Sequence, residues 1–309
     1  MGKSGFVAIV GRPNSGKSTL LNTILGSNLS IVTYKAQTTR ERVLGILTER
    51  QGQIVFVDTP GIHRADKGGL NEYMVREAQG ALEGTSVIWY IVDPHSELIH
   101  ERAVLELLPR ESSQKIFLLM NKLDTIRGVE ARNHAKEVSD AVIEEAKSLG
   151  IEITRKFSIS ALEKKGLGDL VHETWQLLEE GPLYYEDPDQ LSDRPTRFFV
   201  SEMIREQLLL KLGDEVPYSC AVEIQKYDEK AKPLRIEAVI YVERESQKGI
   251  VIGKGAQKIK EIGQEARAKI EDFLGHKIFL GLQVKMLKDW TKDEEAMKRM
   301  GYDPKRKSR

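Results

Sequence analysis

The stretch Gly11-Arg-Pro-Asn-Ser-Gly-Lys-Ser18 decides the fold of this 309-residue chain. It follows an apolar run at residues 6–10 that predicts a strand, and it opens a segment with helical apolar spacing at residues 17–25. A Gly-x-x-x-x-Gly-Lys-Ser loop between a strand and a helix is typical of a phosphate-binding P-loop, because backbone N–H groups and the helix N-terminus face phosphate oxygens. Lys17 would bridge β- and γ-phosphates, and Ser18 would ligate Mg²⁺. The predicted phosphate-contacting residues are Gly11, Arg12, Pro13, Asn14, Ser15, Gly16, Lys17, Ser18 and Thr19.

Around this loop, short apolar runs alternate with helical segments through residue 181. The expected strands cover residues 54–57, 87–92, 116–120 and 151–157, and the expected helices cover 70–83, 100–108, 129–149 and 167–179. Nearly continuous apolar strands that alternate with helices predict a parallel sheet covered on both faces, the doubly wound α/β class. Residues 42–50 alternate more loosely, which predicts an edge strand antiparallel to its neighbour.

A second motif, Asp58-Thr-Pro-Gly61, comes directly after the expected strand 54–57. That strand should lie beside the P-loop strand. Asp58 would then hold the hydration shell of Mg²⁺, and the Gly61 N–H would meet a γ-phosphate. The residues of this segment predicted to contact nucleotide are Asp58, Thr59, Pro60, Gly61 and Ile62.

A third motif, Asn121-Lys-Leu-Asp124, closes the expected strand 116–120. Asp124 would accept hydrogen bonds from N1–H and the exocyclic amine of guanine. Adenine has neither donor there and would leave a buried carboxylate unpaired, which is costly. After the next strand, Ser158-Ile-Ser-Ala161 offers a backbone N–H to the guanine O6. The predicted base-contacting residues are Asn121, Lys122, Leu123, Asp124, Ser160 and Ala161.

Composition narrows the class of protein. With 40% hydrophobic residues the chain is not disordered, and its length suggests about two domains. One cysteine, Cys220, excludes a disulfide scaffold and a cysteine-based zinc cluster and fits a reducing compartment. No apolar run reaches the roughly 18–20 residues of a membrane helix. These features predict a cytoplasmic protein.

The net charge of zero hides an asymmetry. Residues 196–309 contain 24 Lys and Arg against 19 Asp and Glu, a net charge of +5, and the remainder therefore carries −5. Two ordinary domains of opposite charge explain this, and so does a C-terminal half that meets a polyanion. The charge count alone leaves both readings open.

Beyond residue 181 the pattern changes. Residues 182–195 hold three prolines and no apolar period, which predicts a linker. A smaller α+β domain is expected over residues 196–288. Its elements would be a helix at 196–211, strands at 218–226 and 234–243, a Gly-rich turn at 249–255, a helix at 258–274 and a strand at 277–285. The charged tail, 289–309, is expected to be ragged, and it could lengthen an electrostatic contact with RNA.

Taken together, the motifs resemble those of translation-factor-like G proteins and, more closely, the Era family of bacterial ribosome-assembly GTPases. The resemblance covers nearly the whole chain and includes Lys35-Ala-Gln-Thr-Thr-Arg40, Ser192-Asp-Arg-Pro195, Glu215-Val-Pro-Tyr218 and Val251-Ile-Gly-Lys-Gly255. It implies a P-loop NTPase domain at residues 1–181, with GTP and GDP as substrate and product. In this family a threonine completes the Mg²⁺ shell only when GTP is bound. Thr39 matches best, with Thr38 a close competitor, so the implied Mg²⁺ residues are Ser18, Thr39 and Asp58.

The loop at residues 251–256 leads into a basic helix and resembles the Gly-x-x-Gly loop of a type II KH domain. The sequence departs from the pattern at its fourth position, where Ala256 replaces the second glycine. Such a loop approaches the backbone of about four unpaired nucleotides, an adjoining apolar groove takes the bases, and lysines neutralise phosphates. The implied RNA-binding residues are Ile250, Ile252, Gly253, Lys254, Gly255, Ala256, Lys258, Ile259 and Lys260.

The catalytic machinery departs from that of Ras-type GTPases. Ile62 stands where those proteins place a water-orienting glutamine, and an isoleucine cannot position a nucleophile. Asn14 occurs in relatives that use K⁺ in place of an arginine finger, and the alternative is that it only supports the loop. His63 fits a surface histidine better than a base. The expected catalytic residues are Asn14, Lys17, Thr39 and Gly61.

The resemblance implies GTP hydrolysis coupled to binding of the 3′ region of 16S rRNA during rRNA processing and 30S subunit biogenesis. A monomer is expected, and a peripheral contact with the cell membrane stays open because some family members show it. Three alternatives are a GTPase of tRNA modification or with tandem G domains, an RNA-binding scaffold stabilised by nucleotide, and an ATP-driven RNA remodeller. A single P-loop motif set argues against the first, and Asp124 argues against the last.

Overall fold

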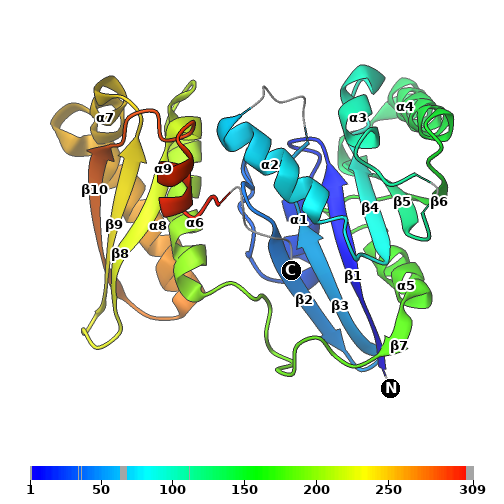
Figure 1. The fold of residues 1–309 in the computed structure, drawn as a ribbon, viewed down its shortest axis with the longest axis horizontal. Coiled ribbons are helices and arrows are strands. Elements are labelled where there is room, and N and C mark those ends of the chain that lie inside the picture. Colours follow the sequence, from blue (N-terminus) through cyan, green and yellow to red (C-terminus); the bar gives the residue numbers. More distant parts are fainter. Residues whose placement is uncertain (1, 34, 36, 63–67, 111, 304–309) are drawn as a thin grey trace.

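The computed structural model describes residues 2–33, 35, 37–62, 68–110 and 112–303. Figure 1 shows two lobes side by side, one built from the first 181 residues and one from residue 196 onward, joined by an extended segment. The first lobe is a sheet between helices, and the second is a smaller sheet with helices packed on it. Sequence patterning predicts both.

The first lobe contains the predicted doubly wound sheet. Its strands are β1 (Gly2–Gly11), β2 (Val43–Glu49), β3 (Gly52–Asp58), β4 (Val87–Val92), β5 (Lys115–Met120), β6 (Ile153–Ser158) and β7 (Glu179–Gly181). They run in the order β2-β3-β1-β4-β5-β6, and β7 adds to β1. β2 is antiparallel to β3, as its looser alternation predicts, and the other neighbours on this path are parallel. The antiparallel pairing of β7 with β1 is not predicted.

Helices cover both faces of this sheet. They are α1 (Lys17–Leu25), α2 (Gly69–Gly80), α3 (Leu98–Leu105), α4 (Gly128–Ser148) and α5 (Leu167–Leu177). Residues of α2, α3 and α4 pack into one apolar cluster, and residues of α1 and α5 pack into a second one. Fully buried β1 side chains contribute to both clusters, Ala8 and Val10 to the first and Val7 and Ile9 to the second. A strand buried on both faces explains why its sequence is almost continuously apolar.

The predicted linker runs along the edge strand of the first lobe. The Ser192 hydroxyl donates to the Leu44 carbonyl (2.6 Å), and the Ile46 N–H donates to the Leu191 carbonyl (2.9 Å). The Gln53 side chain also accepts from the backbone N–H groups of Tyr184 and Tyr185. These contacts give the linker a defined path along β2 and β3.

The second lobe has the element order predicted for a type II KH domain, with one addition. Its elements are α6 (Thr196–Lys211), β8 (Ala221–Asp228), β9 (Leu234–Val242), α7 (Glu245–Ile252), α8 (Gln257–Leu274) and β10 (Ile278–Met286). The sheet order is β10-β9-β8, with β10 parallel and β8 antiparallel to β9. α7 corrects the expected Gly-rich turn at 249–255, because most of that segment is helical.

The expectation of a ragged tail is wrong for residues 290–302. A short helix, α9 (Glu294–Arg299), lies there, and Trp290, Met297 and Tyr302 are buried. They pack with Tyr73 and Met74 of α2 in a cluster that joins the two lobes. Burial of these apolar side chains orders a segment whose charges alone predict mobility. The basic residues at 305–309 lie outside the described residues.

Candidate functional site

The P-loop surrounds the amine of Lys17, which belongs to the loop motif and begins α1. The Lys17 Nζ donates to the carbonyl oxygens of Gly11 (3.0 Å) and Arg12 (2.7 Å). Burial lowers the pKa of Lys17 from 10.5 to about 8, and the Asp58 carboxylate opposes that shift. The loop therefore holds an amine whose charge is poorly solvated, and an anion placed against it would favour the charged form.

Three oxygen atoms meet beside this lysine. The Ser18 Oγ donates to Asp58 Oδ2 (2.8 Å) and lies 3.0 Å from Thr39 Oγ1, which lies 3.5 Å from the same Asp58 oxygen. Burial raises the pKa of Asp58, against the effect of Lys17 and its hydrogen bonds. The buried Asp58 Oδ1 has no hydrogen-bond partner among the described residues. Two hydroxyls and a buried carboxylate with a spare oxygen are a donor set that fits Mg²⁺.

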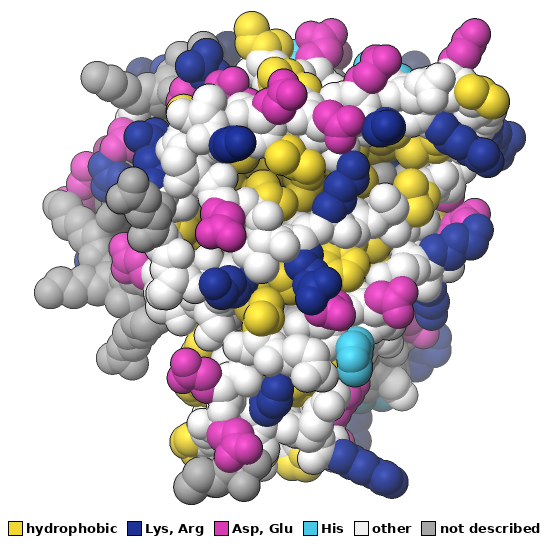
Figure 2. All heavy atoms as spheres, turned by 90° about the vertical axis from the view of Figure 1, so that its right-hand side faces the viewer, with side chains coloured by type: hydrophobic (Ala, Val, Ile, Leu, Met, Phe, Trp, Pro, Cys, Tyr) yellow, Lys and Arg dark blue, Asp and Glu magenta, His cyan; other side chains and the backbone are white. Residues whose placement is uncertain are grey.

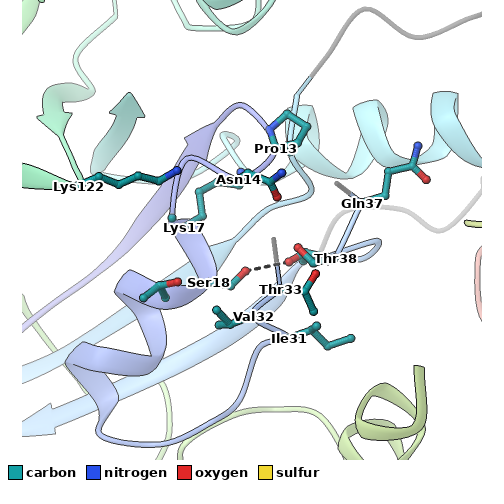
Figure 3. A pocket seen from close by; sticks show the side chains of 14 residues that line it. Pro13, Asn14, Lys17, Ser18, Ile31, Val32, Thr33, Gln37, Thr38 and Lys122 are labelled. Atoms are coloured by element: carbon teal, nitrogen blue, oxygen red, sulfur yellow. Dashed lines mark hydrogen bonds between the residues drawn. The ribbon is translucent and has the colours of Figure 1, made fainter. Parts of the chain in front are cut away.

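A cavity of about 470 Å³ opens over this oxygen cluster. Figure 3 shows the side chains of Pro13, Asn14, Lys17, Ser18, Thr38 and Lys122 gathered around it. Of the predicted nucleotide residues, the cavity is lined by Pro13, Asn14, Gly16, Lys17, Ser18, Thr19, Thr39, Gly61 and Lys122. It is also lined by Ile31, Val32, Thr33, Gln37 and Thr38. Gln37 and Thr38 belong to the quoted motif at residues 35–40, whereas Ile31, Val32 and Thr33 belong to no motif and reach the cavity through the path of the α1–β2 connection.

Two glycines let backbone segments approach closely at this site. A Cβ on Gly16, whose φ is +104°, would lie 2.2 Å from Asn121 Nδ2. A Cβ on Gly61 would lie 2.6 Å from the backbone N and Cα of Pro13. The P-loop is thus in contact with both the base motif and the Asp58-Thr-Pro-Gly61 segment, so side chains at either position would push the three motifs apart.

The third motif is tied to the P-loop through Asn121. Its Nδ2 donates to the Ser15 carbonyl (2.9 Å), and its Oδ1 accepts from the Ala161 N–H (3.0 Å). The Ser160 hydroxyl donates to Asp124 Oδ1. Asn121 therefore fixes the distance between the phosphate loop and the base motif, and Ser160 orients the carboxylate that would read guanine.

Several predicted contact residues have structural partners of their own. The Arg12 guanidinium donates to the Ser96 hydroxyl (2.8 Å), which donates to the buried Glu101 carboxylate (2.6 Å). The Lys122 Nζ pairs with Asp93 (2.6 Å). Thr59 donates to the Ile9 carbonyl (2.8 Å) and so holds the turn after β3 against β1.

Ile62 belongs to the core. It is 2% exposed and packs in the cluster that contains Ala8 and Val10, while its N–H donates to the Gly11 carbonyl (3.1 Å). A buried isoleucine here agrees with the inference that no side chain at position 62 orients a nucleophile. His63 lies outside the described residues. Asn14, with φ at +63°, stands on the P-loop at the cavity.

In the second lobe, the Gly-x-x-Gly-like loop connects α7 to α8. Gly253 and Gly255 have φ values of +72° and +58°, and Ala256 has φ at +60°. Ala256 therefore adopts a left-handed conformation that glycine would adopt without strain. The loop keeps a positive φ at the position where the sequence departs from the Gly-x-x-Gly pattern.

A groove of about 280 Å³ lies beside this loop, between α8 and β10. It is lined by Ile259, Lys260, Gly263, Gln264, Arg267, Leu280 and Leu282. Of the predicted apolar residues, only Ile259 lines it, whereas Ile250 is 50% exposed on α7. Sequence reasoning misses Leu280 and Leu282 because they lie on β10, distant in sequence from the loop.

The α1–β2 connection of the first lobe is buried in the second one through Arg40, which follows Thr39 directly. The Arg40 guanidinium is 2% exposed and donates to the carbonyls of Cys220 (2.7 Å), Tyr218 (2.7 Å) and Pro217 (3.4 Å). It also lies 5.9 Å from the ring centroid of Trp290. The segment that brings Thr39 to the oxygen cluster is thereby fixed to the KH-like lobe.

Comparisons with known proteins agree with this arrangement. Residues 6–122 match a family described as 50S ribosome-binding GTPase, and residues 215–291 match the KH domain family. The chain is 40% identical over 302 residues to GTPase Era of Carboxydothermus hydrogenoformans, covering 97% of this chain and 98% of that protein. The chain belongs to the Era family of GTPases. GTPase Era of Syntrophus aciditrophicus is 43% identical over 307 residues, covering 98% of this chain and 96% of that relative.

Two solved Era structures share the whole architecture. The crystal structure of Era in complex with MgGDPNP and nucleotides 1506–1542 of 16S ribosomal RNA superposes with a TM-score of 0.89, at 36% identity over 98% of this chain and 100% of that one. A variant of Aquifex aeolicus Era bound to GDP·AlF4⁻ also gives 0.89, at 35% identity over 97% and 99% of the two chains. The predicted fold and the assignment as a GTP hydrolase are confirmed.

No helix among the described residues is both long and apolar enough to span a membrane. Figure 2 shows the face of the G domain that points away from the KH domain. Lys and Arg alternate there with Asp and Glu, and apolar side chains show between them. The basic side chains of the described residues form no continuous surface in that view.

Proposed function

We propose that this Era-family GTPase binds Mg²⁺ with guanine nucleotides and couples GTP hydrolysis to binding of the 3′ region of 16S rRNA during assembly of the small ribosomal subunit. The observation that carries the coupling is Arg40. It follows Thr39, which meets Ser18 and Asp58 at the nucleotide cavity, and its own side chain is buried in the KH domain. Thr39, which would respond to the γ-phosphate, is thus adjacent in sequence to Arg40, which makes the interdomain contact.

On the nucleotide side, Ser18 and Thr39 would hold Mg²⁺ and Asp58 would hold its water shell. A metal ion held there would supply positive charge to the phosphate oxygens. Lys17 and the P-loop N–H groups bind the phosphates, and the Gly61 N–H orients the γ-phosphate. Asp124 selects guanine over adenine. These residues position the nucleotide and stabilise its negative charge. Catalysis of phosphoryl transfer consists mostly of these two effects.

On the RNA side, the loop at residues 253–256 would approach the sugar–phosphate chain and the groove between α8 and β10 would take bases. The relative with 36% identity is solved with nucleotides 1506–1542 of 16S ribosomal RNA, which supports this RNA as the ligand. The walls of the groove suit stacked bases because Ile259, Leu280 and Leu282 are apolar, and Lys260 and Arg267 supply charge at its rim.

Gly263 offers a test of this groove, since a Cβ added at this position would lie 3.3 Å from the Cδ1 of Leu282. Gly263→Leu should fill the groove and weaken binding of a 16S 3′-end oligonucleotide by at least about tenfold, with GTP hydrolysis without RNA unchanged. Ala268→Leu, at an exposed position of the same helix, is the matched control. Equal RNA affinity for the two variants would refute the assignment of the groove.

We also propose that RNA binds more tightly to the GTP-bound protein. A nucleotide shifts the arrangement of domains only by its differential affinity for the two arrangements. The affinity for the oligonucleotide is therefore measured with GDP and with a non-hydrolysable GTP analogue. Equal affinities would refute the coupling and would show that the GTPase binds RNA independently of its nucleotide.

Because Ile62 is buried and apolar, we propose that K⁺ held with the help of Asn14 assists hydrolysis. Asn14 lines the cavity from the P-loop. The hydrolysis rate should be higher in K⁺ than in Na⁺ at equal ionic strength, and Asn14→Ala should abolish the difference. Equal rates in the two salts for the unaltered protein would show that Asn14 only supports the loop.

A further inference from the structure

Helix α6 of the KH domain reaches the nucleotide site through Arg205. This side chain is 1% exposed, and its guanidinium donates to the backbone carbonyls of Gln37 (3.3 Å) and Thr38. Glu202, one turn earlier in α6, holds the guanidinium by two further bonds, to Nε (2.8 Å) and to Nη2 (2.6 Å). The Arg205 guanidinium thus links the Glu202 carboxylate of its own helix to two successive backbone carbonyls of the α1–β2 connection.

Those two carbonyls belong to the residues directly before Thr39. Gln37 has φ at +56°, a left-handed conformation that a side chain makes unfavourable, so external contacts must maintain it. The guanidinium of Arg205 supplies one such contact, and the Gln37 Nε2 donates to Asn71 Oδ1 of α2 (3.3 Å). Thr39 is therefore flanked by Arg205 on one side and by its neighbour Arg40 on the other, and both contacts are made with the KH domain.

We propose that Arg205 is a positioning residue for GTP hydrolysis, which keeps the hydroxyl of Thr39 at the metal site by holding the carbonyls of Gln37 and Thr38. The KH domain then supplies part of the active conformation of the GTPase. This role goes beyond RNA binding, and it rests on the proposed function of Thr39 at the Mg²⁺ site.

The contact of Thr39 with the metal and the contact of Arg205 with the α1–β2 connection must strengthen each other equally, because they are thermodynamically coupled. If the contact of Thr39 with the metal favours the Arg205 contact, then Arg205 favours that metal contact by the same factor. Under the proposed function, Thr39 completes the Mg²⁺ shell only with GTP bound. Loss of Arg205 should therefore weaken the Mg²⁺-dependent binding of a GTP analogue and slow hydrolysis, and it should leave GDP binding unchanged.

The experiment compares Arg205→Met and Arg205→Lys with Lys211→Met in the full chain and without RNA. Lys211 lies on the same helix and pairs with Glu261 and Glu265 inside the KH domain, so its loss is a matched control. Lysine keeps a positive charge beside Glu202 but cannot bond both carbonyls as the guanidinium does, so Arg205→Lys should retain part of the effect. This variant also allows the test to be made if Arg205→Met does not fold. Steady-state kcat and the Mg²⁺ concentration for half-maximal binding of a fluorescent GTP analogue are measured, with GDP binding as the reference.

Arg205→Met should raise the Mg²⁺ requirement of the GTP analogue about tenfold, with GDP affinity within about twofold of the unaltered protein. It should also lower kcat, because the Thr39 hydroxyl is then at the metal site less often. Arg205→Lys should fall between, and Lys211→Met should behave as the unaltered chain. Unchanged kcat and Mg²⁺ requirement in a folded Arg205 variant would overturn the proposal. So would an equal loss of GDP and GTP-analogue affinity, because that reports a general structural role. Since RNA is absent from the assay, a failure of RNA binding cannot be mistaken for either result.

Discussion

The lowered pKa of Lys17 predicts how nucleotide affinity responds to pH. The pKa falls from 10.5 to about 8 because the amine is buried. At 1.36 kcal/mol per unit, charging this amine in the folded, nucleotide-free protein costs about 3 kcal/mol more than in water. Phosphate oxygens of a bound nucleotide would restore the charged form, so binding above pH 8 must take up a proton.

The direction of each pH effect depends on which state of the protein binds the Lys17 proton more tightly. Between pH 8 and pH 10.5 the unfolded chain keeps the Lys17 proton and the folded, nucleotide-free protein loses it. The contribution of this group to the free energy of unfolding therefore rises with pH in that window. Nucleotide affinity changes the other way. At pH 9 only about a tenth of the free protein carries charged Lys17, so the affinity for GDP should be about tenfold lower than at pH 7.

The assay is calorimetric titration of nucleotide-stripped protein with GDP and Mg²⁺ at intervals of pH between 7 and about 9, in buffers of different ionisation enthalpy so that proton uptake is counted. Lys17→Met is the control, since it should bind weakly and show little change over the same range. An affinity that stays constant from neutral to alkaline pH, or a fall of equal size in Lys17→Met, would refute the reasoning.

Three further outcomes follow from the structure. Asp124→Asn, which loses the carboxylate that Ser160 orients, should lower GTP affinity at least about 100-fold and favour xanthine nucleotides, as competition binding would show. Arg40→Met leaves three KH-domain carbonyls without their donor and should lower the free energy of unfolding by about 3 kcal/mol in denaturant titrations; a change below about 0.5 kcal/mol would contradict the contact. Ala256→Gly should raise that free energy by about 1 kcal/mol because it relieves the positive φ, whereas Ala268→Gly within α8 should lower it by a similar amount. A fall for Ala256→Gly would show that the loop is not strained.

Much of the site could be predicted because its residues sit where strands end. Asp58 ends one buried strand and Asn121 follows another in the same sheet, so their meeting at the P-loop follows from topology. Thr39 could not be distinguished from Thr38 by sequence, since the two are adjacent in a loop. In the structure the Thr39 hydroxyl meets Ser18 and the Thr38 carbonyl meets Arg205, which supports the proposal of Thr39 as the metal residue.

The parts that sequence patterning missed are those whose order comes from distant contacts. The segment at β7 is three residues long and begins with two glutamates, so nothing local indicates its pairing with β1. The segment at α7 contains Gly249, which favours a turn, yet the Gln247 side chain accepts from the N–H groups of Glu243 and Arg244 and caps the helix. Trp290 and Tyr302 are isolated aromatics among charges, and they are buried against partners far away in sequence, among them Tyr73 and the guanidinium of Arg40.

The burial of Arg40 bears on how the enzyme can be dissected. A G domain truncated after the linker would lose the carbonyls and aromatic rings that surround this guanidinium, and the cation would face water or the nucleotide cavity instead. The Thr39 beside it would then sample conformations that the whole enzyme does not. Catalytic constants from such a fragment would describe a nucleotide site in which the α1–β2 connection has another conformation. A bulky fusion near Tyr302 would disturb the same contact.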